Sequence, residues 1–182
     1  MKKLWVLLAA TAIVSCNKEA SVDYALISGK ISNADKKEIT LRSVNNPSFK
    51  SHKIVLKEDG TFTDTIKVAG HFTLYQARNA TPLHLEAGTN ITINFDAKDF
   101  DSSLTLSGNG AETSTYLVAK NSKAKELMGK GTGVYTQGEV DYKKTFYSIK
   151  TAQKDLLNTA TGISDAYKAK EERNIQYAYW AN

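Results

Sequence analysis

The sequence predicts an α+β fold, with an N-terminal antiparallel β-sandwich or partly open barrel followed by a C-terminal helical segment of two to three helices. Apolar and polar residues alternate with a period of two from Tyr24 to Ser107, which is typical of strands that bury one face. After Gly108-Asn109-Gly110 the apolar residues instead recur every three to four positions, as they do along an amphipathic helix. Strands that come first and helices that follow indicate the α+β class. This pattern fits a sandwich and a partly open barrel equally.

The first fifteen residues predict a lipoprotein signal peptide. Lys2 and Lys3 form a positive start, and the apolar run Leu4–Val14 is shorter than the roughly 20 residues that a membrane-spanning helix needs. The next residues, Ile13-Val14-Ser15-Cys16, resemble a bacterial lipobox, in which the cysteine thiol receives a diacylglycerol. We therefore expect Cys16 to be the lipidated first residue of the mature protein, so that its lipid attaches the protein to a membrane of the cell envelope.

An ordinary cleavage after Ala10-Thr11-Ala12 is the alternative for this region. It would leave Leu4–Ala9 as a hydrophobic stretch below the usual length, so lipidation is the favoured interpretation. Residues 16–21 would form a short polar tether. Because Asn17 and not aspartate follows the cysteine, we expect the protein to be attached to the outer membrane, on its periplasmic or surface face, rather than to the inner membrane.

Eight strands are predicted in residues 22–108. Their expected ranges are Tyr24–Ile31, Glu38–Ser43, Lys53–Lys57, Thr61–Val68, Phe72–Ala77, Leu83–Ala87, Asn90–Phe95 and Ser103–Ser107. Asp59-Gly60 predicts a tight hairpin between the third and fourth strands, because both residues tolerate the positive φ angles of such turns. Asn79-Ala80-Thr81-Pro82 predicts a break after the fifth strand.

Three helical stretches are predicted in residues 109–182. The first is Ala111–Met128, the second follows the spacing of Tyr142, Phe146, Ile149, Leu156 and Ala160, and the third is Ile163–Trp180. Along the third, Ile163, Tyr167, Asn174 or Ile175, and Ala178 share one side. Its end holds Tyr177, Tyr179 and Trp180 close together, which suggests a missing partner surface. We expect either that this helix packs back on the β domain or that the protein is one half of something larger.

Several stretches of this sequence resemble a known family. They are Tyr24–Ile31, Glu58–Phe62, Leu85–Ile93, Ser107–Glu112 and Tyr116. Together they resemble the N-terminal domain and helical linker of envelope lipoproteins that continue into a thioredoxin-like disulfide reductase domain of the TlpA/ResA type. The resemblance implies a β domain of unassigned function that precedes the linker. The reductase domain and its Trp-Cys-x-x-Cys site are absent from this sequence, so no catalytic residue is carried over.

The side chains that could carry chemistry favour structural roles. Cys16 is the single cysteine, which excludes an intramolecular disulfide and a cysteine-based zinc site. The three histidines, His52, His71 and His84, have no second ligand at metal-binding spacing, and His84 is expected on the polar face of a strand. We therefore predict no catalytic residue, no metal site and no cofactor.

Two loops have sequences that suggest ligands but lack the full motifs. Asp96, Asp99 and Asp101 could meet a calcium ion, but the segment lacks the glycine turn and terminal glutamate of an EF-hand loop. The loop Gly129-Lys130-Gly131-Thr132-Gly133 follows a helix and lacks the GxxxxGK[ST] register, so it is interpreted as a hinge.

The charge pattern argues against a nucleic-acid partner. The net charge of +5 includes Lys2 and Lys3, whose removal leaves about +3, and no run of five basic residues occurs. The sequence thus predicts a non-catalytic envelope lipoprotein module, the accessory or docking part of a thioredoxin-like thiol-disulfide oxidoreductase, whose protein partner meets the helical tail. The alternative is an envelope lipoprotein that binds a glycan or peptide through its β domain. That alternative requires a line of exposed aromatic side chains on a sheet, for which the β domain offers Tyr24 and Tyr75.

Overall fold

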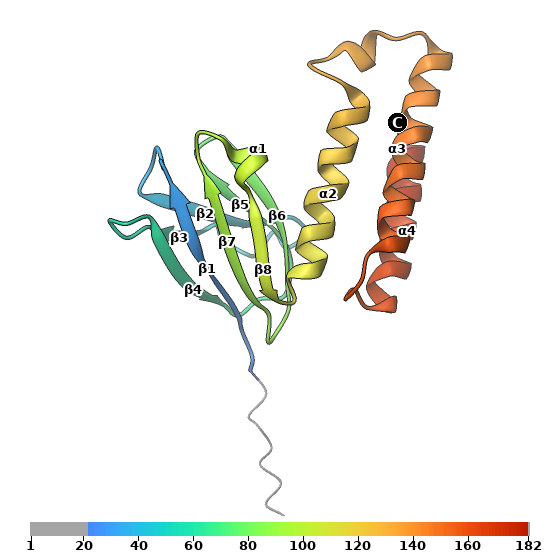
Figure 1. Ribbon diagram of the computed structural model, residues 1–182. Helices are drawn as coiled ribbons and strands as arrows, with labels where there is room; N and C mark the ends of the chain where they lie inside the picture. Colours follow the sequence, from blue (N-terminus) through green and yellow to red (C-terminus); the bar gives the residue numbers. More distant parts are fainter. Residues whose placement is uncertain (1–21, 182) are drawn as a thin grey trace, which may run out of the picture.

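The computed structural model describes residues 22–181 as a β-sandwich with a helical segment beside it (Figure 1). Eight strands form two separate four-stranded sheets, which confirms the α+β class and selects the sandwich over the partly open barrel. The strands are β1 (Ala25–Ser32), β2 (Glu38–Ser43), β3 (His52–Val55), β4 (Thr61–Ile66), β5 (Gly70–Gln76), β6 (Asn79–Leu85), β7 (Asn90–Asp96) and β8 (Thr105–Asn109). Each expected strand is present, and its ends lie within four residues of the expected positions.

The two sheets differ in how their strands are paired. One has the order β3-β2-β5-β6 and is antiparallel throughout. The other has the order β4-β1-β7-β8 and contains a parallel pair, β1 with β7, in which Leu26 lies opposite Asn90. The expectation of a fully antiparallel sandwich is therefore wrong at this one pair. Period-two alternation sets which face a strand buries, and it carries no information about strand direction.

The core lies between the sheets and is built from the inward residues of each strand. Its fully buried members include Ile27, Leu41, Leu83 and Ile93. The alternation breaks at Gly29, whose inward position holds no side chain and lets the backbone of Ile93 approach closely. The alternating apolar residues thus bury one face of each sheet against the other.

The predicted hairpin at Asp59-Gly60 is wrong, although the turn itself forms. Gly60 has a φ of +80°, and the Lys57 amide donates to the carbonyl of Thr61 at 2.8 Å. Beyond this turn β3 pairs with β2 and β4 pairs with β1, so the chain crosses from one sheet to the other. Local residues determine the turn, whereas burial of the strand faces determines which sheet each strand joins.

The predicted break at Asn79–Pro82 is wrong as well, because these residues belong to β6. The chain instead turns between Gln76 and Asn79, and Ala77 adopts a positive φ of 51° there. Proline lacks an amide hydrogen, but β6 is an edge strand, so Pro82 can occupy it without removing an interior ladder bond.

Three long helices follow the sandwich, as expected. They are α2 (Ala111–Met128), α3 (Glu139–Thr159) and α4 (Asp165–Trp180). Two short helices that the sequence analysis did not predict, α1 (Phe100–Ser103) and η1 (Gly133–Thr136), lie in the connections. The predicted range of α2 is confirmed, and the buried residues Phe146, Ile149 and Leu157 confirm the apolar side of α3.

Helix α2 connects the sandwich to the other helices. It contacts β6 and β8, the edge strands of the two sheets, and Ala111 joins the sandwich core. The buried hydroxyl of Ser114 accepts a hydrogen bond from the His84 amide at 2.9 Å, which satisfies a backbone group on the edge of β6. Helix α3 packs on α2, and α4 packs on α3 (Figure 1).

Candidate functional site

A buried carboxylate, Glu171, joins α4 to α2. Its Oε1 accepts hydrogen bonds from the Lys120 ammonium at 2.5 Å and from the Tyr116 hydroxyl at 3.3 Å, and its Oε2 accepts one from Asn174 at 3.1 Å. The side chain of Glu171 is 4% exposed and that of Lys120 is 18% exposed. Because three donors share the charge, this group is an internal ion pair that holds two helices together.

Three aromatic rings lie next to this ion pair, between β5, β6 and α4. The His71 and His84 rings lie opposite each other in the β5–β6 ladder, with 4.7 Å between their centroids. The ring of Tyr167 on α4 lies 4.9 Å from that of His84 and 5.7 Å from that of His71. The N-terminal half of α4 therefore packs back on the β domain, which confirms that alternative for this half of the helix.

The environment of this region shifts the pKa values of three groups. Burial, reinforced by the nearby Glu171 carboxylate, raises the pKa values of Tyr116 and Tyr167 far above the ordinary range of a phenol. Burial and the adjacent His84 ring lower the pKa of His71. Both phenols thus stay protonated and His71 favours its neutral form, which suits a packing role better than proton transfer.

The opposite end of α4 carries exposed aromatic side chains. Trp180 is 67% exposed, Tyr177 is 58% exposed and their ring centroids lie 5.7 Å apart. Tyr147 of α3 is 57% exposed and meets Tyr179 at 6.2 Å, and the Lys150 ammonium lies 4.7 Å from the centre of the Tyr179 ring. These five residues are called the aromatic surface below.

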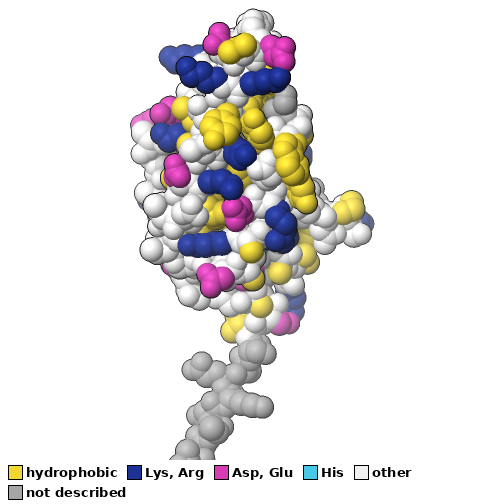
Figure 2. Space-filling view, turned by 90° about the vertical axis from the view of Figure 1, so that its right-hand side faces the viewer, with side chains coloured by type: hydrophobic (Ala, Val, Ile, Leu, Met, Phe, Trp, Pro, Cys, Tyr) yellow, Lys and Arg dark blue, Asp and Glu magenta, His cyan; other side chains and the backbone are white. Residues whose placement is uncertain are grey.

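The aromatic surface is accessible and lies far from the start of the described chain. Figure 2 looks onto the helical side and shows hydrophobic side chains gathered in the upper half, with Lys and Arg side chains around them. In Figure 1, α4 ends in the upper half of the molecule, whereas β1 begins at the lower end. A second molecule could therefore reach this surface without contacting the start of β1.

The residues singled out from the sequence do not gather into one site. Cys16 lies outside the described residues. His52 lies at the other side of the sandwich, where its Nε2 is 2.8 Å from Oδ2 of Asp64 and links β3 to β4. His84 lies on the face of β6 that points away from the sandwich core, as expected for the polar face of a strand, and its side chain is only 14% exposed because Tyr167 covers that face of the sheet.

The acidic loop forms local hydrogen bonds. The Asp96 carboxylate accepts hydrogen bonds from the Asn33 amide group and the Lys98 backbone amide, and the Asp99 carboxylate accepts one from the hydroxyl of Ser102. Throughout residues 22–181, no three His, Cys, Asp or Glu side chains are arranged to hold a metal ion. The glycine-rich loop 129–133 follows α2 and leads into η1.

Tyr24 and Tyr75 do not form an aromatic platform. Tyr24 directly precedes β1, whereas Tyr75 lies in β5 of the other sheet, where the Arg42 guanidinium is 5.3 Å from its ring centre. Both tyrosines are partly buried. The feature that would favour glycan binding by the β domain is therefore absent from the part of the chain that the structure describes.

Sequence reasoning missed Glu171 and the pairing of His71 with His84. A signal for Glu171 was available, because Ile163, Tyr167, Glu171 and Ile175 recur every four residues and a charge in such a row indicates a buried ion pair. The structure selects Ile175 over Asn174 as the buried residue of that row. The pairing of the histidines depends on the turn at Ala77, which the sequence analysis did not predict because it placed the break at Asn79–Pro82.

Within residues 22–181, no helix has both the length and the apolar composition required to cross a bilayer.

Comparisons with known proteins give no family assignment. No family model matches the chain, and no curated protein matches it. Among solved structures, a DUF3823 family protein from Parabacteroides merdae is 11% identical, with a TM-score of 0.32 over 41% of this chain and 46% of that one. A DUF3823 family protein from Bacteroides ovatus is 12% identical, with a TM-score of 0.32 over 40% and 44% of the two chains.

A third similar structure is a proposed cell adhesion protein from Bacteroides ovatus. It is 12% identical, with a TM-score of 0.27 over 48% of this chain and 43% of that one. Each match spans less than half of the other protein's length. These likenesses are partial, and none of the three is described as a thioredoxin-like reductase.

Proposed function

We propose that this chain is a non-catalytic lipoprotein module of the cell envelope, held at the membrane by lipid on Cys16, which docks a thioredoxin-like disulfide reductase domain through its aromatic surface. The exposure of Tyr177 and Trp180 is the observation that carries the proposal. Tyr and Trp are the side chains that most often dominate binding energy at protein interfaces, because they bury much apolar area with little loss of rotamer freedom.

Two further observations support docking over catalysis. The only cysteine in the chain is Cys16, so if lipid occupies its thiol, any thiol-disulfide chemistry must use cysteines of the partner. The buried ionisable groups Glu171, Lys120 and Tyr116 already bond one another and link two helices. The resemblance of the sequence to reductase-associated domains suggests which class of partner would occupy the aromatic surface.

Replacing Cys16 with serine is expected to abolish lipid attachment, because the diacylglyceryl group is joined to the cysteine sulfur through a thioether bond. Cells fed an alkyne-tagged palmitate should label the wild-type protein and leave the Cys16→Ser variant unlabelled. The variant should also move from the membrane fraction to the soluble fraction. Ser15→Ala, which keeps a small residue before the cysteine, is the matched control and should be labelled. Labelling of Cys16→Ser would contradict the lipidation proposal.

A photo-crosslinking residue at position 177 is expected to capture a protein that contains a Cys-x-x-Cys site. The crosslinker is introduced in cells that make the full lipoprotein, and the captured partner is identified by mass spectrometry. The same residue at Val44, which is 60% exposed on the β domain, is the control. Equal capture from both positions, or capture at 177 of a partner without that motif, would contradict the docking proposal.

Replacing both Tyr177 and Trp180 with serine is expected to weaken the complex at least about thirtyfold, the effect of losing a central aromatic hot spot. Both side chains are exposed, so the helical circular dichroism signal should be unchanged. Titration with the reductase domain captured at position 177 measures the affinity, and Val44→Ser should bind as the wild type does. An unchanged affinity of the double variant would place the partner elsewhere on the molecule.

A further inference from the structure

The sandwich has four edge strands, and α2 covers one of them, β6. On β6, Pro82 has no amide hydrogen to offer and Ser114 of α2 bonds the backbone of His84. Strands β3 and β4 lie at the opposite side of the sandwich, where His52 and Asp64 link them at 2.8 Å. Open strand edges can pair with other chains, so natural proteins commonly cover them or keep them short.

The fourth edge strand, β8, has a free side. It pairs with β7 alone, and no hydrogen bond found among residues 22–181 joins a β8 backbone group to α2 or to another helix. Ser107 and Gly108 are exposed there. An exposed edge of this kind can accept an extended peptide as an additional strand through main-chain hydrogen bonds.

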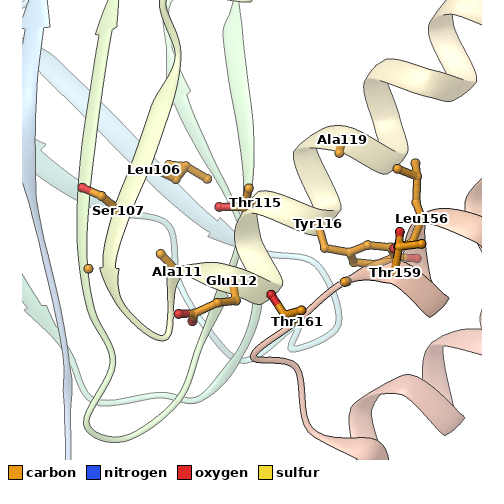
Figure 3. A pocket seen from close by; sticks show the side chains of 12 residues that line it. Leu106, Ser107, Ala111, Glu112, Thr115, Tyr116, Ala119, Leu156, Thr159 and Thr161 are labelled. Carbon is orange, nitrogen blue, oxygen red and sulfur yellow. The ribbon is translucent and has the colours of Figure 1, made fainter.

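A groove of about 440 Å³ opens beside this edge (Figure 3). One wall is β8, the floor is the first half of α2, and the other wall is the end of α3 with the loop that follows it. The side chains from the helices and that loop are mostly small: Ala111, Thr115, Ala119, Thr159, Ala160 and Thr161. The volume lies in the range of ligand-binding pockets, and small side chains allow a peptide backbone to approach closely.

The groove contains a single charge. Glu112 is the only ionisable acid or base among its lining residues apart from the Tyr116 phenol. Figure 3 shows the Glu112 carboxylate on the first turn of α2, directed toward the β8 side of the groove. No described ion pair uses this carboxylate, and the side chain is exposed. Charge complementarity therefore favours a ligand with one cationic group at this point.

We propose that this groove binds an extended peptide that carries a Lys or Arg side chain, with the peptide backbone adding to β8 and its cation facing Glu112. The strand edge provides the main-chain hydrogen bonds, and the carboxylate determines the register, because a shift of one residue would turn the cation to the other face. This site is separate from the aromatic surface and does not depend on the docking proposal.

The first test uses fluorescent eight-residue peptides of alternating threonine and valine, each with one lysine at a different position, titrated against the full lipoprotein in detergent. At least one register should bind saturably. N-methylation of alternate backbone amides in that peptide should weaken binding about tenfold or more, because it removes main-chain donors. Replacement of its lysine with glutamate should weaken binding by about the same factor.

Two outcomes of this test would overturn the proposal. Absence of saturable binding at every lysine position, up to millimolar peptide, would exclude the site. Binding that depends on the lysine but tolerates N-methylation on both alternate sets of amides would show ion pairing at the surface without strand addition, which also contradicts it.

The second test locates the binding in the groove. Glu112→Lys should invert the preference, so that the glutamate peptide binds about tenfold more tightly than the lysine peptide. Glu126→Lys changes the same charge near the far end of α2, outside the groove, and should leave both affinities unchanged. Thr115→Trp should block binding by filling the groove, with circular dichroism confirming that the helices are intact. Equal effects of Glu112→Lys and Glu126→Lys would place the peptide outside the groove.

Discussion

Replacing Gly29 with valine is expected to destabilise the sandwich strongly. A Cβ atom at this position would lie 1.7 Å from the carbonyl oxygen of Ile93 and 2.6 Å from its carbon, far inside contact distance. Both groups are backbone at the centre of the sandwich, so they can separate only if β1 and β7 move apart. Because β1 and β7 are the middle strands of their sheet, the loss should exceed about 4 kcal/mol, against a total stability of about 5–15 kcal/mol for a typical domain.

Urea denaturation followed by circular dichroism measures this loss. Gly138→Ala is the matched control, because no atom lies within 4 Å of a Cβ at Gly138 and its φ of −62° suits any residue. The control should change the free energy of unfolding by less than about 1 kcal/mol. A Gly29→Val variant within that same margin would show that the parallel pair of β1 and β7 is not formed as described.

Replacing Glu171 with alanine is expected to destabilise the protein by about 3 kcal/mol, because it leaves the Lys120 ammonium and the Tyr116 hydroxyl without their buried acceptor. This loss of stability should lie at the lower end of the range for broken buried ion pairs, since Lys120 is 18% exposed and its ammonium can turn partly to water. The neighbouring residue provides a control. Glu172 pairs with Lys154 on the surface, where water screens the pair, so Glu172→Ala should lose much less stability than Glu171→Ala.

A second variant separates the lost ion pair from other damage to α4. Replacing Glu171 with leucine and Lys120 with methionine together removes both charges and keeps apolar volume, so stability should recover most of what Glu171→Ala loses. Both variants are measured by urea denaturation. Equal losses for Glu171→Ala and Glu172→Ala would mean that the buried network does not hold α2 and α4 together.

Local pattern was sufficient for most of the secondary structure. The range Ala111–Met128 and the strand Glu38–Ser43 were predicted as they occur, because their side-chain spacing reflects a single buried face. The mistaken elements have a common origin. The interpretations of Asp59-Gly60 and Pro82 rest only on the backbone conformations that these residues favour. Distant strands determine whether a turn joins two strands of one sheet and whether a proline lies in an edge strand.

The candidate sites show the same division. The aromatic end of α4 was recognisable in the sequence, because Tyr177, Tyr179 and Trp180 are neighbours along the chain. Three other features combine segments that are far apart in the sequence. Tyr167 lies against His84, Lys120 contacts Glu171, and the groove lies between β8 and the helices. No local signal specifies such contacts.

The amino-acid sequence by itself determined the α+β class, the succession of strands and helices and the residues that face inward, because each depends on periodicity within a short segment. Only the tertiary structure decided the parallel pairing of β1 with β7, the burial of Glu171 and the open edge of β8. The physical reason is that these features follow from which faces and edges meet when the whole chain packs, and burial energy is shared among residues that are distant along the chain.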